Sequence, residues 1–259
     1  MTPPVGDGAF ARWLAVRAGD LLLTLRDDLG YADPAGLRDA GDKRSHDLLV
    51  TELQRWRPGD AVLSEEAVDD VAARRSAERV WIIDPLDGTR EFGEPGRTDW
   101  AVHVALWSRS CGLEAGAVGL PAQHRVLATD QPPGYPPLPQ PPPPRLRLAV
   151  SRSRPPAWLA AVSEQVGAEP VPMGSAGAKI AAVITGEVDA YLHAGGQFEW
   201  DSAAPVAVAA ATGLHTSRID GSTLRYNQPD PRLPDLLVCR RDLADRLLAA
   251  IARNAQETS

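Results

Sequence analysis

Residues 80–89 read VWIIDPLDGT, and they join a short apolar run to a turn that carries two carboxylates. The four apolar residues at its start are typical of a buried strand. The proline and glycine that follow predict a sharp turn directly after that strand. Such a turn brings Asp84 and Asp87 into one pocket and frees the Leu86 carbonyl from strand pairing.

The chemistry of this turn suits a hard cation and a phosphate. Carboxylate and carbonyl oxygens are the ligands that Mg²⁺ prefers, and carboxylates this crowded repel one another unless a cation is present. Gly88 and Thr89 offer backbone N–H groups at a predicted helix start, where phosphate binds well. Taken alone, the motif fits equally well with an ordinary turn rich in Asp, Pro and Gly.

Two other acidic positions follow or begin predicted apolar elements. Glu65 and Glu66 come directly after a short strand over residues 61–63. Asp201 follows Trp200 at the start of a helix whose residues are nearly all apolar, so that this helix is expected to be buried on most sides. Each position also has a plain structural explanation, as a solvated turn for the two glutamates and as a helix N-cap for Asp201.

The remaining chain predicts a mixture of helices and strands. Further helices are expected over residues 9–29, 44–57, 175–185 and 242–253. Further strands are expected over 80–83, 99–107, 113–120, 146–150 and 188–192. Because the order has no strict βαβ rhythm, we expect a layered α/β architecture rather than a barrel.

A proline-rich segment divides the chain. Residues 131–144 read QPPGYPPLPQPPPP and predict a stiff, extended connector. The alternative is a ligand for an SH3-type domain. We expect an N-terminal half over 1–130 with most metal motifs, this connector, and a C-terminal half over 145–259 with the last metal ligand.

Composition narrows the class of protein. Apolar residues make up 44% of the chain and charged residues 24%, which is typical of a globular protein with a proper core. The net charge of −7 argues against non-specific binding to nucleic acid, although metal ions would still allow an anionic ligand. No apolar run approaches the ~18 residues of a membrane span, and the N-terminus lacks the apolar region of a signal peptide. With two cysteines in no zinc or redox pattern, we expect a cytoplasmic protein with reduced thiols.

Three segments together resemble the signature set of the inositol monophosphatase superfamily in both order and spacing. They are Leu63-Ser64-Glu65-Glu66, the run from Trp81 to Thr89, and Trp200-Asp201-Ser202-Ala203-Ala204. The resemblance covers nearly the whole chain. It implies a layered αβαβα sandwich, lithium-sensitive and Mg²⁺-dependent phosphatase activity, and a homodimer.

The resemblance also implies a set of metal ligands. Glu65, Asp84 and the Leu86 carbonyl would hold a first Mg²⁺ ion. Asp84, Asp87 and Asp201 would hold a second ion. A third ion would bind Glu65 through water, so that each site would contain two or three ions.

The same resemblance implies how water attacks the phosphate. Asp42 falls where the family has an aspartate that pairs with the threonine of the turn, here Thr89, and the pair would orient the attacking water. One metal would make a hydroxide available near neutral pH while another neutralises charge on the leaving oxygen. The remaining task is positioning, so that no covalent nucleophile is needed and no cysteine or histidine has a required place.

Neighbouring residues point to one branch of the superfamily. Arg90-Glu91-Phe92 resembles the ending of the D-G-T-[KR]-E-F motif of the 3'(2'),5'-bisphosphate nucleotidases, the CysQ type of sulfate assimilation. Inositol-directed members have an acidic residue before the Trp-Asp pair, whereas residues 193–196 read HAGG. Residues 174–179, GSAGAK, resemble the nucleotidase segment near the nucleotide. The implied substrate-binding residues are Asp87, Gly88, Thr89, Arg90, Ser175 and Lys179; the alternative for Lys179 is an ordinary solvated position.

The expected substrate is therefore a small phosphate ester rather than a nucleic-acid polymer or a membrane. The branch implies hydrolysis of the 3'-phosphate of 3'-phosphoadenosine 5'-phosphate (PAP) to AMP and phosphate. An inositol-1-phosphate or fructose-1,6-bisphosphate phosphatase of the same superfamily is the alternative. A non-catalytic metal-binding or scaffold protein, with the proline tract as its recruiting element, is the rival from another class. It is disfavoured because every metal and water-orienting position is filled.

Overall fold

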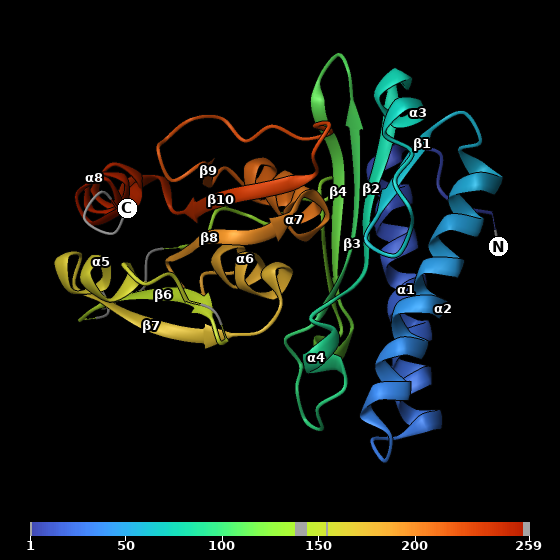
Figure 1. The fold of residues 1–259 in the computed structure, drawn as a ribbon, viewed down its shortest axis with the longest axis horizontal. Coiled ribbons are helices and arrows are strands. Elements are labelled where there is room, and N and C mark those ends of the chain that lie inside the picture. The colour runs from blue at the N-terminus through green and yellow to red at the C-terminus, as the bar shows by residue number, and fades with distance from the viewer. Residues whose placement is uncertain (1, 138–143, 154, 256–259) are drawn as a thin grey trace.

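Residues 2–137, 144–153 and 155–255 of the computed structural model form five alternating layers of helices and sheets (Figure 1). The order is a helix pair, a sheet, a second helix pair, a second sheet and a third helix pair. This arrangement confirms the αβαβα sandwich that the sequence implied. The helices are α1 (Asp7–Leu29), α2 (Pro34–Trp56), α3 (Val71–Ser76), α4 (Thr89–Phe92), α5 (Leu159–Gln165), α6 (Ala176–Ile184), α7 (Glu199–Thr212) and α8 (Ala244–Ala255).

Two five-stranded sheets form the β-layers. The first sheet has the order β1 (Ala61–Ser64), β2 (Arg79–Asp87), β3 (Ala101–Ser108), β4 (Gly112–Leu120) and β5 (Arg125–Ala128). The second has the order β7 (Ala168–Met173), β6 (Leu146–Ser151), β8 (Ala190–Phe198), β10 (Arg232–Cys239) and β9 (His215–Ser217). Two short 3₁₀ turns, Pro121–Gln123 and Arg241–Leu243, complete the described elements.

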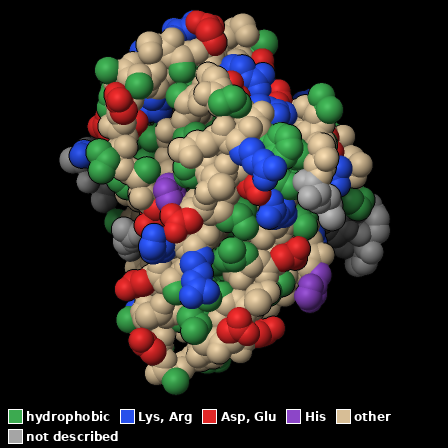
Figure 2. Space-filling view, turned by 90° about the vertical axis from the view of Figure 1, so that its right-hand side faces the viewer, with side chains coloured by type: hydrophobic (Ala, Val, Ile, Leu, Met, Phe, Trp, Pro, Cys, Tyr) green, Lys and Arg blue, Asp and Glu red, His purple; other side chains and the backbone are tan. Residues whose placement is uncertain are grey.

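Helices α1 and α2 cover the outer face of the first sheet. Their inward residues, including Phe10, Leu14 and Leu22, are fully buried against that sheet. The opposite face of these helices shows charged side chains of both signs mixed with scattered hydrophobic ones (Figure 2). This division is the one expected of amphipathic surface helices.

The predicted start of α2 at residue 44 was wrong by ten positions. The helix begins at Pro34, because Asp33 caps it through an oxygen 3.0 Å from the Gly36 amide and proline suits the first helical position. The added turns contain few apolar residues, so that their periodicity was too weak to show the helix. The consequence for the site is that Asp42 lies on a regular helix.

Helices α6 and α7 form the central layer between the two sheets. The residues of α7 are nearly all buried, as the apolar sequence predicted. Gly116 of β4 allows this helix to approach closely, since a Cβ there would lie 2.8 Å from Ala207 Cβ and 2.9 Å from the Ala204 carbonyl oxygen. The close approach brings the start of α7 next to the end of β2.

The outer layer of the C-terminal half was only partly predicted. Helix α8 was expected and packs with α5 on the second sheet. Strand β7 contains Pro170 and Pro172 and was missed, because proline rarely occurs inside strands. It is tolerated here at the edge of the sheet.

The two sheets lie on opposite sides of the proline-rich segment in the sequence. Residues 138–143 of that segment lie outside the described residues, so the predicted extended connector is described only at its ends. Tyr135 accepts a hydrogen bond from the Arg241 amide at 3.0 Å. Both cysteines are free thiols, Cys111 exposed and Cys239 buried. Among the described helices, none has the length and apolar character needed to cross a bilayer.

Candidate active site

The turn at the end of β2 has the geometry that its sequence predicted. Strands β2 and β3 pair regularly up to Asp84, and their register then shifts before Asp87. The Leu86 amide donates to Asp84 Oδ1 at 3.1 Å, and the Leu86 carbonyl accepts from Thr89 Oγ1 at 3.0 Å. Gly88 takes the left-handed conformation, with φ of 85°, immediately before α4. The two aspartates and the Leu86 carbonyl are thereby brought to one place.

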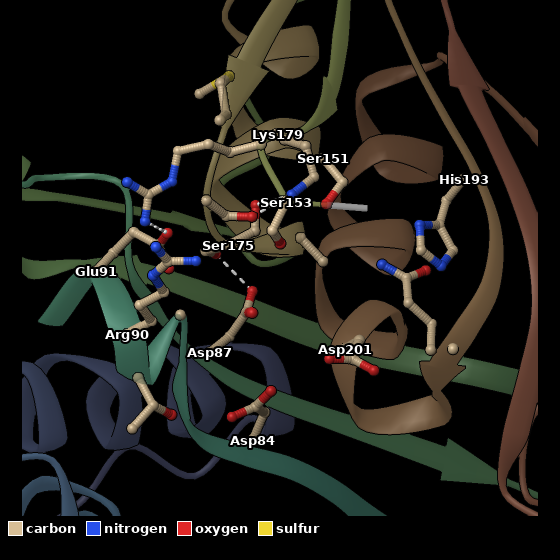
Figure 3. Close-up of a pocket in the computed structure, with 18 of the residues that line it drawn as sticks. Asp84, Asp87, Arg90, Glu91, Ser151, Ser153, Ser175, Lys179, His193 and Asp201 are labelled. Atoms are coloured by element: carbon tan, nitrogen blue, oxygen red, sulfur yellow. Dashed lines mark hydrogen bonds and ion pairs between the residues drawn. The ribbon is translucent and has the colours of Figure 1, made fainter. Parts of the chain in front are cut away.

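Five carboxylates line one cavity of about 290 Å³, and four of them, from three elements, are the proposed metal ligands; the fifth is Glu91 of α4. Glu65 comes from the turn after β1. Strand β1 runs parallel to β2, and its Ser64 pairs with Ile83. Asp201 comes from the first turn of α7. Figure 3 shows Asp84, Asp87 and Asp201 directed toward the same space. The carboxylates that the sequence proposed as metal ligands therefore converge, together with Leu86, which also lines the cavity.

Burial and mutual repulsion disfavour ionisation of these carboxylates. Burial, followed by the charge of Glu65, raises the pKa of Asp84 well above its ordinary value. Burial and the charge of Asp87 raise the pKa of Asp201 to about 8. Glu65 is exposed as a residue but stands in a recess, where lost hydration and the charge of Asp87 raise its pKa to about 7. A divalent cation among these side chains would reverse all of these effects.

The hydrogen bonds accepted by Asp84, Asp87 and Asp201 leave some of their carboxylate oxygens for such a cation. Asp84 is fully buried, and its Oδ2 has no hydrogen-bond partner among the described residues. The Oδ2 atom of Asp87 accepts from Ser175 Oγ and from the Gly177 amide at 2.7 Å, and neither bond uses its Oδ1. Asp201 Oδ2 accepts from the Phe198 amide at 2.6 Å. The N-cap explanation for Asp201 is wrong, because Phe198 is the N-cap and Asp201 is the third residue of the helix; its Oδ2 accepts from the N-cap amide, and this bond leaves the other oxygen for a ligand.

Asp42 and Thr89 meet as the sequence predicted. Thr89 Oγ1 lies 3.2 Å from Asp42 Oδ1, although the two residues are on α2 and α4. Asp42 is half-buried, and burial together with the charge of Glu66 raises its pKa to about 7. A hydroxyl has one proton, so Thr89 can donate either to Asp42 or to the Leu86 carbonyl at one time.

The structure separates the two cations that the sequence proposed for the substrate. Arg90 is mostly exposed and pairs with Glu94 at 3.2 Å. Lys179 is buried, so the solvated alternative is wrong. Its Nζ donates to the carbonyl oxygens of Gly174 and Ser175, the latter at 2.9 Å. The ammonium therefore holds the turn that presents Ser175 to Asp87.

A third cation in the cavity was missed. Arg152, just after β6, lies 2.6 Å from Glu91 Oε1 and 3.0 Å from Glu94 Oε1, and 28% of its side chain is exposed. It sits between two serines, Ser151 and Ser153, which also line the cavity. A polar run directly after a predicted strand was the available signal, since strand ends often carry functional side chains.

Strand β8 supplies the other wall of the cavity. Its lining residues are Tyr191, His193, Gly196 and Gln197, with no carboxylate among them. The Gln197 amide donates to the Tyr191 hydroxyl at 2.9 Å, which orders the deep part of this wall. The sequence assigned no role to the histidines, yet His193 lies in the cavity and His103 lies 3.3 Å from Asp87 Oδ2.

A buried ionic network connects the segment after Glu65 to the start of α7. Arg74 is almost fully buried and forms an ion pair with Asp69 at 2.7 Å. It also donates to Asn227 Oδ1 at 2.6 Å. The Asn227 amide in turn donates to Glu199 at 2.6 Å, two residues before Asp201. This chain of contacts fixes α3 relative to the helix that carries Asp201.

The chain is similar to known proteins in both sequence and fold. Residues 17–135 and 144–257 match the sequence family described as "Inositol monophosphatase family". The chain is 53% identical over 260 residues to the 3'-phosphoadenosine 5'-phosphate phosphatase of Mycobacterium leprae, covering 95% of this chain and 93% of the relative. It is 56% identical over 239 residues to the protein of the same name from Mycobacterium tuberculosis, covering 91% and 89%. The crystal structure of CysQ from Bacteroides thetaiotaomicron matches with a TM-score of 0.73, 24% identity, and coverage of 89% of this chain and 96% of that one. At that identity, the structural match concerns the fold alone.

Proposed function

The chain belongs to the inositol monophosphatase family, and on this basis we propose that it hydrolyses the 3'-phosphate of PAP to give AMP and inorganic phosphate. Relatives that are 53% and 56% identical carry the name of this activity. The chain is thus an enzyme, a phosphomonoesterase of the CysQ type. The observation that carries the proposal is the convergence of Glu65, Asp84, Asp87 and Asp201 on one cavity that also contains three cationic side chains.

The family is metal-dependent, and the cavity fits a hard divalent cation. The supporting observations are the buried Asp84 oxygen without a partner and the raised pKa values of Glu65 and Asp201. We propose Mg²⁺ as the ion and Glu65, Asp84, the Leu86 carbonyl, Asp87 and Asp201 as the residues that hold two or three ions. Bound there, Mg²⁺ would promote ionisation of the attacking water and offset charge on the phosphate and leaving oxygens.

Thr89 and Asp42 are proposed to orient the attacking water. When Thr89 donates its one proton to Asp42, the lone pairs of its oxygen are free to accept a hydrogen bond from water. The 3.2 Å contact between the two side chains supports this arrangement. Donation to Asp42 would also release the Leu86 carbonyl, the second acceptor of the same proton, to serve as a metal ligand.

We propose that Arg152 and Arg90 hold the second phosphate of the substrate. A guanidinium has five donors in a planar fork, which matches a phosphate better than a point charge does. Arg152 uses some of its donors on Glu91 and Glu94, yet it remains partly exposed to the cavity. Lys179 would act indirectly, because its ammonium is already bonded to the carbonyls of the Gly174–Ser175 turn.

The alternatives within the family differ in what they require of the cavity. Inositol-1-phosphate has no second phosphate for Arg152 to bind, and the β8 wall has no carboxylate to bind its hydroxyl groups. Fructose 1,6-bisphosphate does have a second phosphate, so the arginines alone do not separate it from PAP. The names of the relatives favour the nucleotide.

Phosphate release from PAP by the purified protein, with Mg²⁺ and with EDTA, tests the proposal. We expect release that depends on Mg²⁺ and that disappears in Asp84→Asn. A non-catalytic metal-binding protein would release no phosphate under either condition, and that outcome would reject the proposal. We also propose a homodimer, on the family resemblance, and light scattering coupled to gel filtration would measure it.

A further inference from the structure

We infer that Asp99 is a positioning residue that holds the Gly174–Ser175 turn, and that this turn fixes the Asp87 carboxylate in the cavity. The inference rests on the proposed function, because it takes Asp87 as a metal ligand. Asp99 lies two residues before β3, whereas the turn directly precedes α6 in the C-terminal half of the chain. The Asp99 side chain is largely buried, with 14% of it exposed.

Asp99 binds both backbone amides of this turn. The Gly174 amide donates to Asp99 Oδ2 at 2.7 Å, and the Ser175 amide donates to the Asp99 carbonyl oxygen at 3.2 Å. Lys179 Nζ donates to the two carbonyl oxygens of the same turn. All four backbone polar groups of the turn are therefore paired, and the two amides are held from the other half of the chain.

The turn fixes one oxygen of Asp87. Ser175 Oγ and the Gly177 amide both donate to Asp87 Oδ2, the amide at 2.7 Å. The next residue, Gly88, packs against the same contact. A Cβ there would lie 3.0 Å from Ser175 Cβ and 3.3 Å from the Asp99 carbonyl oxygen. A displaced turn would therefore disturb both Asp87 and the backbone that follows it.

The segment that carries Asp99 is itself anchored. Trp100 is fully buried, and its ring meets that of Phe92 edge to face with the centroids 5.0 Å apart. The buried Arg26 guanidinium lies 5.2 Å from the Trp100 ring centroid and donates to the Arg97 carbonyl oxygen at 3.3 Å. Asp99 therefore holds the turn from a fixed backbone.

A long-range effect of the Asp99 charge and a purely structural contact are the competing interpretations. Arg97 forms an ion pair with Asp99, so that a neighbouring charge offsets that of the carboxylate. Asp99 is absent from the described residues that line the cavity, which argues against direct contact with an ion. The hydrogen bonds of the turn, in contrast, connect Asp99 to Asp87 in two steps.

The first test measures the dissociation constant of Mn²⁺, used in place of Mg²⁺, in full-length variants. Asp99→Ala should bind Mn²⁺ about tenfold more weakly, the low end of the effect of losing an outer contact of a metal ligand. Asp99→Asn removes the same charge but keeps an oxygen that can accept from the Gly174 amide, and it should recover most of the affinity. Unchanged affinity in Asp99→Ala, or equal losses in the two variants, would overturn the inference.

Asp220→Ala is the matched control for the loss of one carboxylate. Asp220 Oδ1 accepts from the Ser222 amide at 2.8 Å in an exposed loop, so that this variant loses a comparable bond outside the turn. It should bind Mn²⁺ like wild type. A loss of affinity equal to that of Asp99→Ala would show an effect of net charge and contradict the inference.

A double-variant cycle separates positioning from stability. Ser175→Ala removes the hydroxyl that the turn presents to Asp87. In that background Asp99→Ala should weaken Mn²⁺ binding by a smaller factor than in wild type, because the two changes act along one path. Losses that multiply would show that Asp99 does not act through the turn. Thermal unfolding in EDTA identifies the variants that are folded at the assay temperature, and Asp99→Ser carries the same prediction where Asp99→Ala does not fold.

Asp87→Asn tests the premise of the inference. Unchanged Mn²⁺ affinity in Asp87→Asn would reject the proposed metal site itself, and the inference with it. Weaker binding in Asp87→Asn together with unchanged binding in Asp99→Ala would keep the metal site and contradict the role of Asp99 alone. We expect weaker binding in both variants, and recovery in Asp99→Asn.

Discussion

Arg152 and Glu91 form an ion pair on the wall of the cavity, with Arg152 Nη2 2.6 Å from Glu91 Oε1. The pair joins the end of β6 to α4, and α4 directly follows the turn that carries Asp84 and Asp87. The Arg152 guanidinium is therefore held at a fixed place beside the proposed metal site. Arg152 is only partly exposed, whereas Arg90 is mostly exposed. We therefore expect Arg152 to contribute more than Arg90 to binding the second phosphate.

Arg152→Ala should lower kcat/KM for PAP about 10- to 100-fold, the effect of losing hydrogen bonds worth roughly 1.5–3 kcal/mol to a charged group. Arg90→Ala should have a smaller effect of the same kind. Neither change should alter kcat/KM for inositol-1-phosphate, which has no second phosphate. The measurement is the ratio of kcat/KM for the two substrates in each variant, and an unchanged ratio in Arg152→Ala would remove Arg152 from the specificity determinants.

Lys179→Ala should behave differently from both arginine variants. The ammonium holds the turn that presents Ser175 to Asp87, so its loss should disturb a metal ligand and lower kcat for both substrates. Steady-state kinetics on PAP and inositol-1-phosphate check this. A loss confined to PAP would instead place Lys179 in direct contact with the second phosphate.

Asp84→Asn should lower kcat by at least about a hundredfold, the scale of removing one key electrostatic element. The same variant should be at least as stable as wild type without metal, because it removes a fully buried carboxylate that its neighbours repel. Thermal unfolding in EDTA and phosphate release at saturating Mg²⁺ check the two halves of this prediction. Half of the wild-type rate in the variant would rule out a central role for Asp84.

Thr89→Ala and Asp42→Asn should each remove most of the activity, and the double variant should lose little more. Residues that act as one unit show strongly non-additive effects, and these two side chains meet at 3.2 Å. The cycle is measured as kcat on PAP at saturating Mg²⁺. Losses that multiply in the double variant would show that the two residues act independently.

The metal-free protein should become less stable as pH rises from about 5 to about 8. The folded-state pKa is about 7 for Asp42 and Glu65 and about 8 for Asp201, whereas carboxyls in an unfolded chain have pKa values near 4. Between these values the folded state binds more protons, so the free energy of unfolding falls as pH rises. The stabilisation is complete below about pH 4 and is lost as pH rises through the folded-state values.

Mg²⁺ should oppose this trend, because it binds the ionised carboxylates. The rise in Tm on adding Mg²⁺ should therefore grow over the same pH range. Thermal unfolding at several pH values, with EDTA or Mg²⁺, measures both effects. Asp84→Asn serves as the control and should flatten the trend in EDTA. Higher metal-free stability at pH 8 than at pH 5 would contradict the raised pKa values.

The turn after β2 and the helix α7 could be predicted from their local sequence. The turn after β2 could be predicted because proline, glycine and two aspartates constrain the backbone within a few residues, and the observed register shift follows directly. The buried helix α7 could be predicted because its residues are nearly all apolar. The family resemblance then paired Asp42 with Thr89, which no local pattern indicates.

The rest of the site depends on contacts between distant segments. Arg152 reaches Glu91 across 61 positions of sequence, and His103 reaches Trp200 across 97. Both contacts exist because the central helices bring the two sheets to one cavity. Lys179 shows the same effect, since a lysine in a helix is ordinarily solvated, whereas here neighbouring elements enclose it.

Substrate preference is tested most directly by comparing kcat/KM for PAP, inositol-1-phosphate and fructose 1,6-bisphosphate, measured as phosphate release with the same protein at saturating Mg²⁺. The product from PAP should be identified by chromatography as AMP rather than adenosine 3'-phosphate. We expect the highest kcat/KM for PAP, with AMP as the nucleotide product and no release in EDTA. A higher kcat/KM for either alternative substrate, or removal of the 5'-phosphate of PAP, would contradict it.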